Sequence, residues 1–112
     1  MSEFFQKSIV ILNLDPAKGR EQKGVRPAVI ISGNAFHASA TAIICPVTTV
    51  IKKYAGDIVL KPSRVNGLDE RSEVLVGQVR VVSVERIARK IGKITDTELA
   101  AIFEGLDLLL GR

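Results

Sequence analysis

Polar side chains that end apolar segments are the residues of this sequence whose chemistry stands out. Arg26 directly precedes Pro27, and a residue before proline favours an extended backbone, which gives the arginine a defined direction. Thr48 ends the apolar segment TAIICPVT. Gln78 and Arg80 lie two residues apart in EVLVGQVRVV, so we predict them on one face of a strand. Two arginines with a threonine and a glutamine would bind an anion such as a phosphodiester.

A structural role for the two arginines is the alternative that the sequence leaves open. A charge that cannot reach water is costly to bury, so an arginine on an apolar strand needs a partner. Arg26 and Arg80 would then form ion pairs with Asp15, Glu21 or Glu73. Taken alone, each arginine fits a structural role better than a functional one. Taken together, the two arginines, Thr48 and Gln78 fit an anion-binding site.

Other kinds of catalytic centre find little support. One His and one Cys cannot make a zinc site without several carboxylates, and the sequence has no such cluster. We expect His37 in an exposed loop and Cys45 as a small core residue. The sequence has neither a GxxxxGK[ST] phosphate loop nor a GxSxG elbow, and a single His excludes a pair of histidines as acid and base. We therefore expect neither a metal ion nor a cofactor.

Composition limits the class of protein. The 112 residues suffice for one hydrophobic core, and we predict a single domain over residues 1–112. A net charge of +4 and a pI near 9.5 favour an acidic partner such as nucleic acid. No apolar segment reaches the roughly 18 residues that span a bilayer, and MSEFFQKS lacks the apolar stretch of a signal peptide. The single Cys fits a reducing compartment, so we predict a cytoplasmic protein that has no membrane segment.

Short apolar segments predict a mainly β protein. Strands are expected at residues 8–14, 28–32, 41–48, 57–60 and 73–82, with one more in RKIGKIT. Pro46 cannot donate a ladder hydrogen bond, so it predicts a sheet edge or a bulge near the end of the third strand. Gly77 is a candidate bulge or bend in the longest strand.

The hydrophobic period becomes helical near the C-terminus. Thr95 and Glu98 form a capping box, and Gly111 is placed to end the helix. A helical turn is also expected near residues 84–87. The residues predicted to share one helical face are Leu99, Ile102, Phe103, Leu106 and Leu110. Strands this short protect their edges most simply in a small, partly open barrel.

Several segments together resemble the MazF/PemK family of toxin endoribonucleases. They are, in chain order, NLDPAKGREQKGVRPAVIIS, ICPVTT, GL with Ser72 following, VLVGQVRVVSVERI and KIGKIT. The resemblance extends from Ile9 to Thr95, which is most of the chain. It implies a mainly β fold with a C-terminal α-helix, built as a small SH3-like, partly open barrel of the PemK/CcdB type.

The resemblance also implies roles for particular residues. The family's catalytic pair corresponds to Arg26 and Thr48, and its long loop over the RNA-binding groove corresponds to residues 15–25. The RNA-binding residues that the resemblance implies are Lys18, Arg20, Glu21, Gln22, Lys23, Gln78 and Arg80. Two departures from the family pattern could affect which RNA sequence is bound. The family often has Gly-Asp where this chain has Lys7-Ser8, and often Ser where it has Arg20.

A metal-independent mechanism suits the residues present. The 2′-OH that only RNA supplies can act as the nucleophile. Arg26 is a poor general base, because a guanidinium group stays protonated in proteins. It would instead stabilise the negative charge of a phosphorane-like transition state, either alone or while also protonating the leaving 5′-oxygen. Thr48 would hydrogen-bond a phosphate oxygen or the 2′-OH.

The partners implied by the family are single-stranded RNA, a second copy of the chain, and an antitoxin whose acidic, disordered tail covers the groove. Leu109 and Leu110 lie beside the core stripe of the helix and favour a homodimer. Two other functions stay open. CcdB toxins share the fold and bind gyrase without cutting RNA, and a degenerate relative would bind RNA without cleaving it.

Overall fold

Three neighbouring strands form the centre of a seven-stranded antiparallel sheet in the computed structural model of the chain, which describes residues 4–37 and 39–112. They are β1 (Ser8–Asn13), β2 (Val25–Ile30) and β3 (Thr41–Thr48). The other strands are β4 (Ile58–Leu60), β5 (Ser72–Val74), β6 (Arg80–Ser83) and β7 (Ile87–Lys93). The strand order is β4-β5-β3-β2-β1-β7, and β6 pairs with β3.

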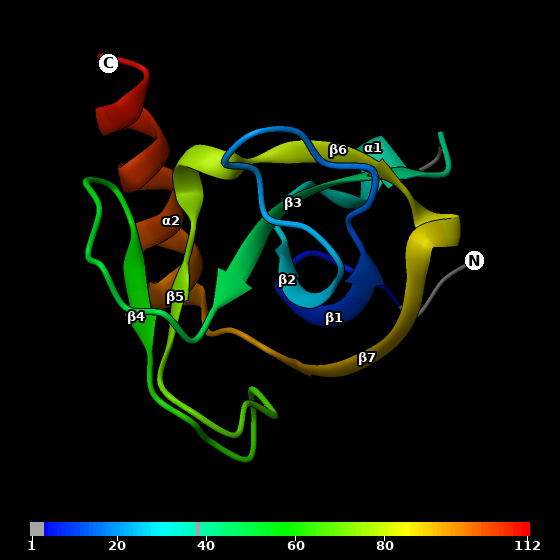
Figure 1. Cartoon of the computed structure of the whole chain (residues 1–112), viewed down its shortest axis with the longest axis horizontal. Coiled ribbons are helices and arrows are strands. Elements are labelled where there is room, and N and C mark those ends of the chain that lie inside the picture. The colour runs from blue at the N-terminus through cyan, green and yellow to red at the C-terminus, as the bar shows by residue number, and fades with distance from the viewer. Residues whose placement is uncertain (1–3, 38) are drawn as a thin grey trace.

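The sheet curls into a barrel that stays open. Figure 1 shows β7 curving around β1 on the side of the molecule opposite to the C-terminal helix. A short 3₁₀ helix, η2 (Val84–Arg86), joins β6 to β7 and confirms the helical turn predicted there. Within the described residues β6 and β7 do not pair with each other. The predicted mainly β fold with a partly open barrel is confirmed.

The central strands bury both of their faces. Side chains alternate along a strand, so consecutive residues enter different clusters. Ile9 and Val29 pack with Ile102 of the C-terminal helix. Val10 and Ile30 belong to the second cluster, between the strands of the barrel. The near-continuous apolar segments of the sequence follow from this two-sided burial.

Strand β3 changes its partner part-way along its length. Residues 41–44 pair with β6, whereas Val47 and Thr48 pair with β5. Pro46 lies between these two regions, and its carbonyl accepts a hydrogen bond from the Leu75 N–H (2.8 Å). The missing N–H of proline is therefore placed where the ladder on that side is interrupted, although β3 itself is central to the sheet.

The strand predicted at residues 73–82 is broken. The chain leaves β5 at Val74, forms the 3₁₀ helix η1 (Val76–Gln78) around Gly77, and begins β6 at Arg80. The break follows from β3, because β5 and β6 pair with different parts of that strand. The prediction that Gln78 and Arg80 share one strand face is therefore wrong.

The C-terminal helix α2 (Asp96–Leu109) begins and ends as predicted. The Thr95 hydroxyl accepts the Glu98 N–H (3.1 Å), and the Glu98 carboxylate accepts the Thr95 N–H (2.8 Å). Gly111 adopts a φ of +75°, and its N–H bonds to the Leu108 carbonyl (3.2 Å).

The predicted apolar face of this helix is only partly confirmed. Leu99 and Ile102 are buried against the sheet. Leu110 is 70% exposed, because it lies beyond the last helical residue, and Phe103 is 40% exposed. The five residues predicted to share one helical face are therefore not all buried.

His37 is the last residue of the short helix α1 (Asn34–His37), so its predicted place in a loop is wrong. Among the described residues, no helix has the length and apolar character needed to cross a membrane.

Helix α2 approaches the loop between β3 and β4 at a contact between two glycines. A methyl group on Gly105 would lie 2.0 Å from the Gly56 carbonyl oxygen. Helix propensity alone favours alanine by about 1 kcal/mol. We expect the backbone clash to outweigh it, so that Gly105→Ala lowers the free energy of unfolding by about 1–3 kcal/mol in urea titrations.

Gly33→Ala is the matched control, because a methyl group at Gly33 meets no atom within 4 Å. We expect it to change stability by less than about 0.5 kcal/mol. A Gly105→Ala protein as stable as the wild type would show that α2 and the loop are not in tight contact.

Candidate functional site

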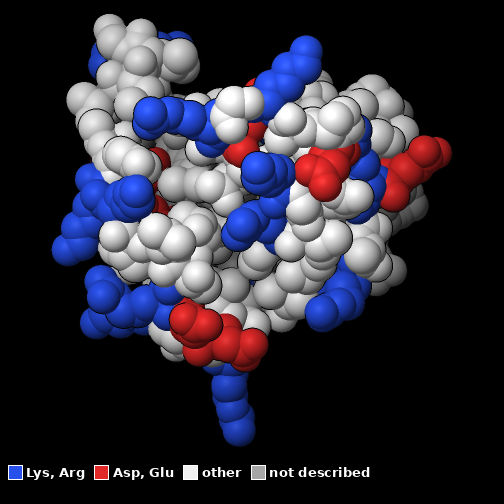
Figure 2. Space-filling model, viewed as in Figure 1, with Lys and Arg blue, Asp and Glu red and all other residues white. Residues whose placement is uncertain are grey.

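The predicted catalytic pair lies in one cleft. Arg26 comes from the start of β2 and Thr48 from the end of β3, and the cleft has a volume of about 440 Å³. Its walls are the loop of residues 14–24, the loop of residues 49–57 and η1. The lining residues are Arg20, Gln22, Arg26, Thr48, Val50, Lys52, Tyr54, Leu75 and Gln78. Figure 2 shows Lys and Arg side chains on both sides of the hollow between these loops.

Arg26 carries a charge that no carboxylate of the described residues neutralises. Its Nε donates to the Lys23 carbonyl (2.9 Å), and its side chain is half-buried. Within residues 4–37 and 39–112 the ion pairs are Lys7–Asp96 and Asp107–Arg112, so the structural ion pairs considered for Arg26 and Arg80 are absent from this part of the chain. The guanidinium of Arg26 is therefore able to bind an anion in the cleft.

Thr48 is held at the floor of the cleft. Only 6% of it is exposed, and its Oγ1 accepts a hydrogen bond from the Val50 N–H (3.1 Å). The bond uses the oxygen as an acceptor, which leaves the hydroxyl hydrogen to be donated. Thr48 can therefore donate to an oxygen of a ligand bound beside Arg26.

Gln78 holds the 14–24 loop across the cleft. Its Oε1 accepts the Gln22 N–H (2.7 Å), and its Nε2 donates to the Arg20 carbonyl (3.3 Å). Both ends of the amide are thus occupied by the backbone of the loop, although the side chain lines the cleft. The contacts make Gln78 an anchor for the loop that carries Arg20 and Gln22.

Two arginines support the base of the same loop through backbone carbonyls. Arg80 Nη1 donates to the Leu14 carbonyl (3.2 Å). Arg86 Nη1 donates to the carbonyls of Asn13 (3.2 Å) and Asp15. Arg80 lies outside the cleft with Arg26 and lines a neighbouring hollow of about 330 Å³. The role of Arg86 could not be recognised from the sequence, because it depends on a contact with residues more than 70 positions away.

The remaining predicted residues of this loop differ in their environment. Glu21 Oε1 accepts the Lys18 N–H (2.7 Å), which closes the loop on itself. Glu21 lines the neighbouring hollow, whereas Lys18 and Lys23 are exposed and line neither space. Gln22 Oε1 is buried and has no hydrogen-bond partner among the described residues, although other atoms of Gln22 line both spaces.

The 49–57 loop rests on a buried carboxylate. Glu73 of β5 is fully buried, and its Oε1 accepts the N–H groups of Lys52 (2.6 Å) and Lys53 (2.8 Å). Its Oε2 accepts the Tyr54 N–H (3.2 Å). Burial alone would raise the pKa of Glu73, but the hydrogen bonds from Asp57 and from these N–H groups outweigh it and lower that pKa.

Cys45 is not placed for chemistry. It lies in the core, and burial followed by the nearby Asp57 raises the pKa of its thiol to about 12. The thiol therefore stays protonated at neutral pH and is a poor nucleophile. The described residues also contain no group of three or more His, Cys, Asp or Glu that would hold a metal ion.

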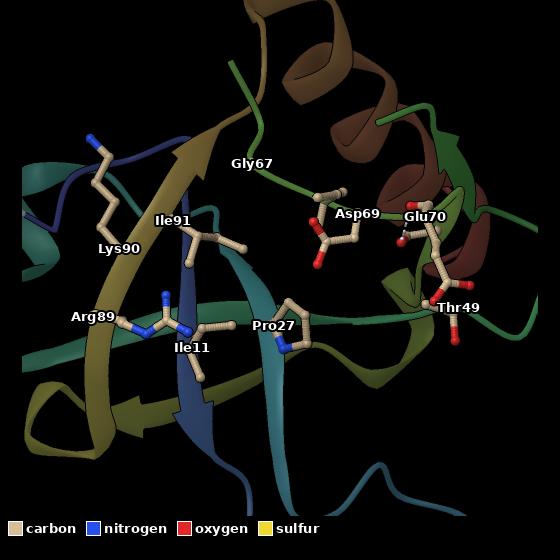
Figure 3. Close-up of a pocket in the computed structure, with 11 residues that line it drawn as sticks. Ile11, Pro27, Thr49, Gly67, Asp69, Glu70, Arg89, Lys90 and Ile91 are labelled. Atoms are coloured by element: carbon tan, nitrogen blue, oxygen red, sulfur yellow. Dashed lines mark hydrogen bonds between the residues drawn. The ribbon is translucent and has the colours of Figure 1, made fainter. Parts of the chain in front are cut away.

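A larger hollow, of about 640 Å³, lies against the outer face of β1, β2 and β7. Figure 3 shows Arg89 and Lys90 on one side of it and Asp69 and Glu70 on the other, with Ile11 and Pro27 between them. It contains none of the predicted site residues. Because it presents both signs of charge, it is less suited to a polyanion than the cleft with Arg26.

The chain is similar to known proteins in both sequence and structure. Residues 5–110 match the family model described as a PemK-like, MazF-like toxin of type II toxin-antitoxin systems. Endoribonuclease MazF9 of Mycobacterium tuberculosis is 35% identical over 105 residues, which cover 88% of this chain and 89% of the relative. Endoribonuclease toxin ChpB of Escherichia coli is 37% identical over 99 residues, which cover 85% and 84%.

Solved structures agree with this match. The crystal structure of MazF from Deinococcus radiodurans superimposes with a TM-score of 0.81, at 29% identity and with 96% of each chain covered. A MazE-MazF structure from the same organism gives a TM-score of 0.76 at 29% identity, covering 96% of this chain and 95% of that one. This chain belongs to the PemK/MazF-like toxin family. The resemblance predicted from the sequence motifs is confirmed.

Four residues that line the cleft of this family member were not predicted from the sequence: the apolar Leu75 and three residues of one loop. Val50, Lys52 and Tyr54 come from the 49–57 loop, and Tyr54 is 57% exposed. A signal was present, because VIKKYAGD places two lysines and a tyrosine between two strands, and the 14–24 loop likewise places charged residues between strands. What the sequence could not show is that Glu73 bonds the backbone of this loop.

Proposed function

We propose that this chain is the endoribonuclease toxin of a type II toxin–antitoxin pair, and that it cleaves single-stranded RNA at the cleft between Arg26 and Thr48 without a metal ion. The observation that carries the proposal is the free charge of Arg26, which lies beside a hydroxyl donor and makes no ion pair with any described carboxylate. Membership of the toxin family, with relatives named endoribonucleases, supports it independently. Cleavage of messenger RNA in the cytoplasm would stop translation and growth.

In the proposed reaction the 2′-oxygen of the RNA attacks the adjacent phosphorus. The bond from phosphorus to the 2′-oxygen forms while the bond to the 5′-oxygen of the next nucleotide breaks. The products are a 2′,3′-cyclic phosphate and a free 5′-OH. Arg26 stabilises the charge that develops on the phosphate oxygens, and Thr48 donates a hydrogen bond to the phosphate or the 2′-OH.

The cleft walls would select the RNA. Arg20 and Lys52 supply positive charge for neighbouring phosphates, and these contacts carry no sequence information. The exposed ring of Tyr54 offers a face on which a base can stack. Gln22 also lines the cleft, and its side-chain amide would hydrogen-bond the edge of a base. Lys18, Lys23 and Arg80 lie farther along the same basic surface, so we assign them phosphate contacts outside the cleft.

The proposed protein partners are a second copy of the chain and an antitoxin. The relatives include MazE-MazF structures, in which the toxin is found with another protein. We propose that an acidic, disordered antitoxin tail covers the basic cleft of this chain and so blocks RNA. We further propose that apolar side chains at the end of α2 form a homodimer interface.

The assembly prediction follows from the exposed end of that helix. Leu108, Leu109 and Leu110 are 63%, 42% and 70% exposed. We expect light scattering at micromolar concentration to give the mass of a dimer. Leu109→Glu should shift the mass toward that of a monomer, because it places a charge in an apolar interface. A wild-type monomer at this concentration would refute the interface.

The test of function is cleavage of a long natural RNA in EDTA, with the cut ends mapped. We expect discrete cuts by the wild type, and a loss of at least about a hundredfold in kcat/KM for Arg26→Ala, the scale seen when one donor to a transition-state charge is removed. Arg89→Ala is the matched control, since it removes the same charge from the other hollow.

Circular dichroism should show Arg26→Ala folded, because the side chain is only half-buried and bonds to one carbonyl. An unfolded Arg26→Ala protein would mean that the residue is structural. Intact RNA together with inhibited gyrase would favour a CcdB-like function instead.

The mechanism is tested by one deoxyribose at the scissile position of an oligonucleotide. We expect it to bind, because phosphate contacts supply most of the affinity of a basic cleft. It should not be cut, because the attacking oxygen is missing. Thr48 is the rival nucleophile, but its described hydrogen bond is with a backbone N–H rather than a base. Cleavage of the substituted bond would point to activated water or to Thr48.

A further inference from the structure

Glu73 is an unusual residue to find beneath a binding loop. A fully buried carboxylate is costly unless hydrogen bonds replace its water. The three N–H groups that Glu73 accepts belong to consecutive residues, Lys52, Lys53 and Tyr54. The carboxylate therefore fixes the backbone of the segment that presents Lys52 and Tyr54 to the cleft.

Asp57 closes the same loop from its other end. Its Oδ1 accepts the Val76 N–H (2.9 Å), which joins the loop to η1. Its Oδ2 is buried and has no hydrogen-bond partner among the described residues, and Glu73 is the neighbouring carboxyl group. Two neighbouring carboxyl groups favour a state with one proton between them, because two adjacent negative charges repel each other.

The surroundings of Asp57 favour that proton. Burial first, and then Glu73, raise the pKa of Asp57 to about 7, whereas Glu73 keeps its charge. The titratable group that acts on Asp57 is Glu73 on β5. Cys45 on β3 also lies near Asp57, but its thiol stays neutral. Element η1 offers only N–H groups, and α2 meets the loop through Gly105 against Gly56.

We propose that Glu73 and Asp57 are positioning residues for RNA binding: together they clamp the 49–57 loop so that Lys52 and Tyr54 face the cleft of Arg26 and Thr48. The proposal rests on the proposed function of that cleft. Neither carboxyl lines the cleft, so both act through the loop backbone. RNA binding then depends on one buried proton held by groups that do not line the cleft, although Glu73 is the cross-strand neighbour of Thr48.

The pH dependence has a definite sign. A carboxyl whose pKa is raised by folding stabilises the folded clamp while it is protonated, and this stabilisation is lost as the pH rises through about 7. Above that pH two adjacent carboxylates repel each other, and the loop loosens. The wild type should therefore bind RNA more weakly at pH 8.5 than at pH 6. Asp57→Asn should bind equally at both, because an amide N–H donates to Glu73 without a titrating proton.

Glu73→Gln is the direct test, with cleavage kinetics and amide hydrogen exchange as the readouts. We expect KM for RNA to rise about tenfold, since small displacements of binding groups are costly. We expect kcat to change little, because replacing only the carboxylate keeps the backbone pairing of Glu73 with Thr48. Exchange should speed up at the amides of Lys52, Lys53 and Tyr54. Glu98→Gln is the matched control, since it also removes a carboxylate that accepts a backbone N–H and lies at the start of α2.

Every result of the Glu73→Gln and Asp57→Asn experiments either supports or overturns the proposed role of the two carboxyl groups. A Glu73→Gln protein with the KM of Glu98→Gln would overturn it, even if its thermal stability fell. If Glu73→Gln does not fold, the wild type is compared with Asp57→Asn instead, and binding of the deoxy-substituted oligonucleotide is measured as a function of pH. The same pH dependence in both proteins would overturn the proposed clamp. A wild type that neither binds nor cuts RNA would overturn the proposed function itself, while hydrogen exchange would still show whether Glu73 holds the loop.

Discussion

The cleft depends on holding positively charged loops without neutralising them. In a loop fixed by ion pairs, the arginines would be paired with carboxylates. Little positive electrostatic potential would then remain to attract a phosphate. Here the anchors are hydrogen bonds to the backbone: Gln78, Arg80 and Arg86 bond the 14–24 loop, and Glu73 bonds the 49–57 loop through N–H groups. Rigidity and free positive charge are thereby obtained together.

Strand β3 connects these anchors to the core. It ends at Thr48, on the floor of the cleft, and it pairs with β6 and β5 in succession. The change of partner creates η1, which places Gln78 against one loop and the Val76 N–H against Asp57 of the other. Both sides of the cleft therefore depend on one interruption in the sheet, at Pro46.

Local signals made part of this structure predictable. The bounds of β3, the capping box of α2 and the place of Thr48 follow from strand composition and cap chemistry, which act over a few residues. The segment around Gln78 was misread because an apolar run does not show which neighbour each part of it will pair with. The Glu73 clamp joins residues about twenty positions apart, and no local pattern marks such a contact.

In the proposed reaction, the division between the floor and the walls of the cleft would separate the chemistry from the choice of RNA. Arg26 and Thr48 lie on strands whose backbone is fixed by the sheet, whereas Arg20, Lys52 and Tyr54 lie on loops. Of the two departures from the family pattern, Lys7 is paired with Asp96 at the start of α2 (2.6 Å), outside the cleft, whereas Arg20 lines it. We therefore infer that Arg20 is the departure that alters RNA selection, and that the reacting groups are insulated from such changes because the sheet, not the loop, holds them.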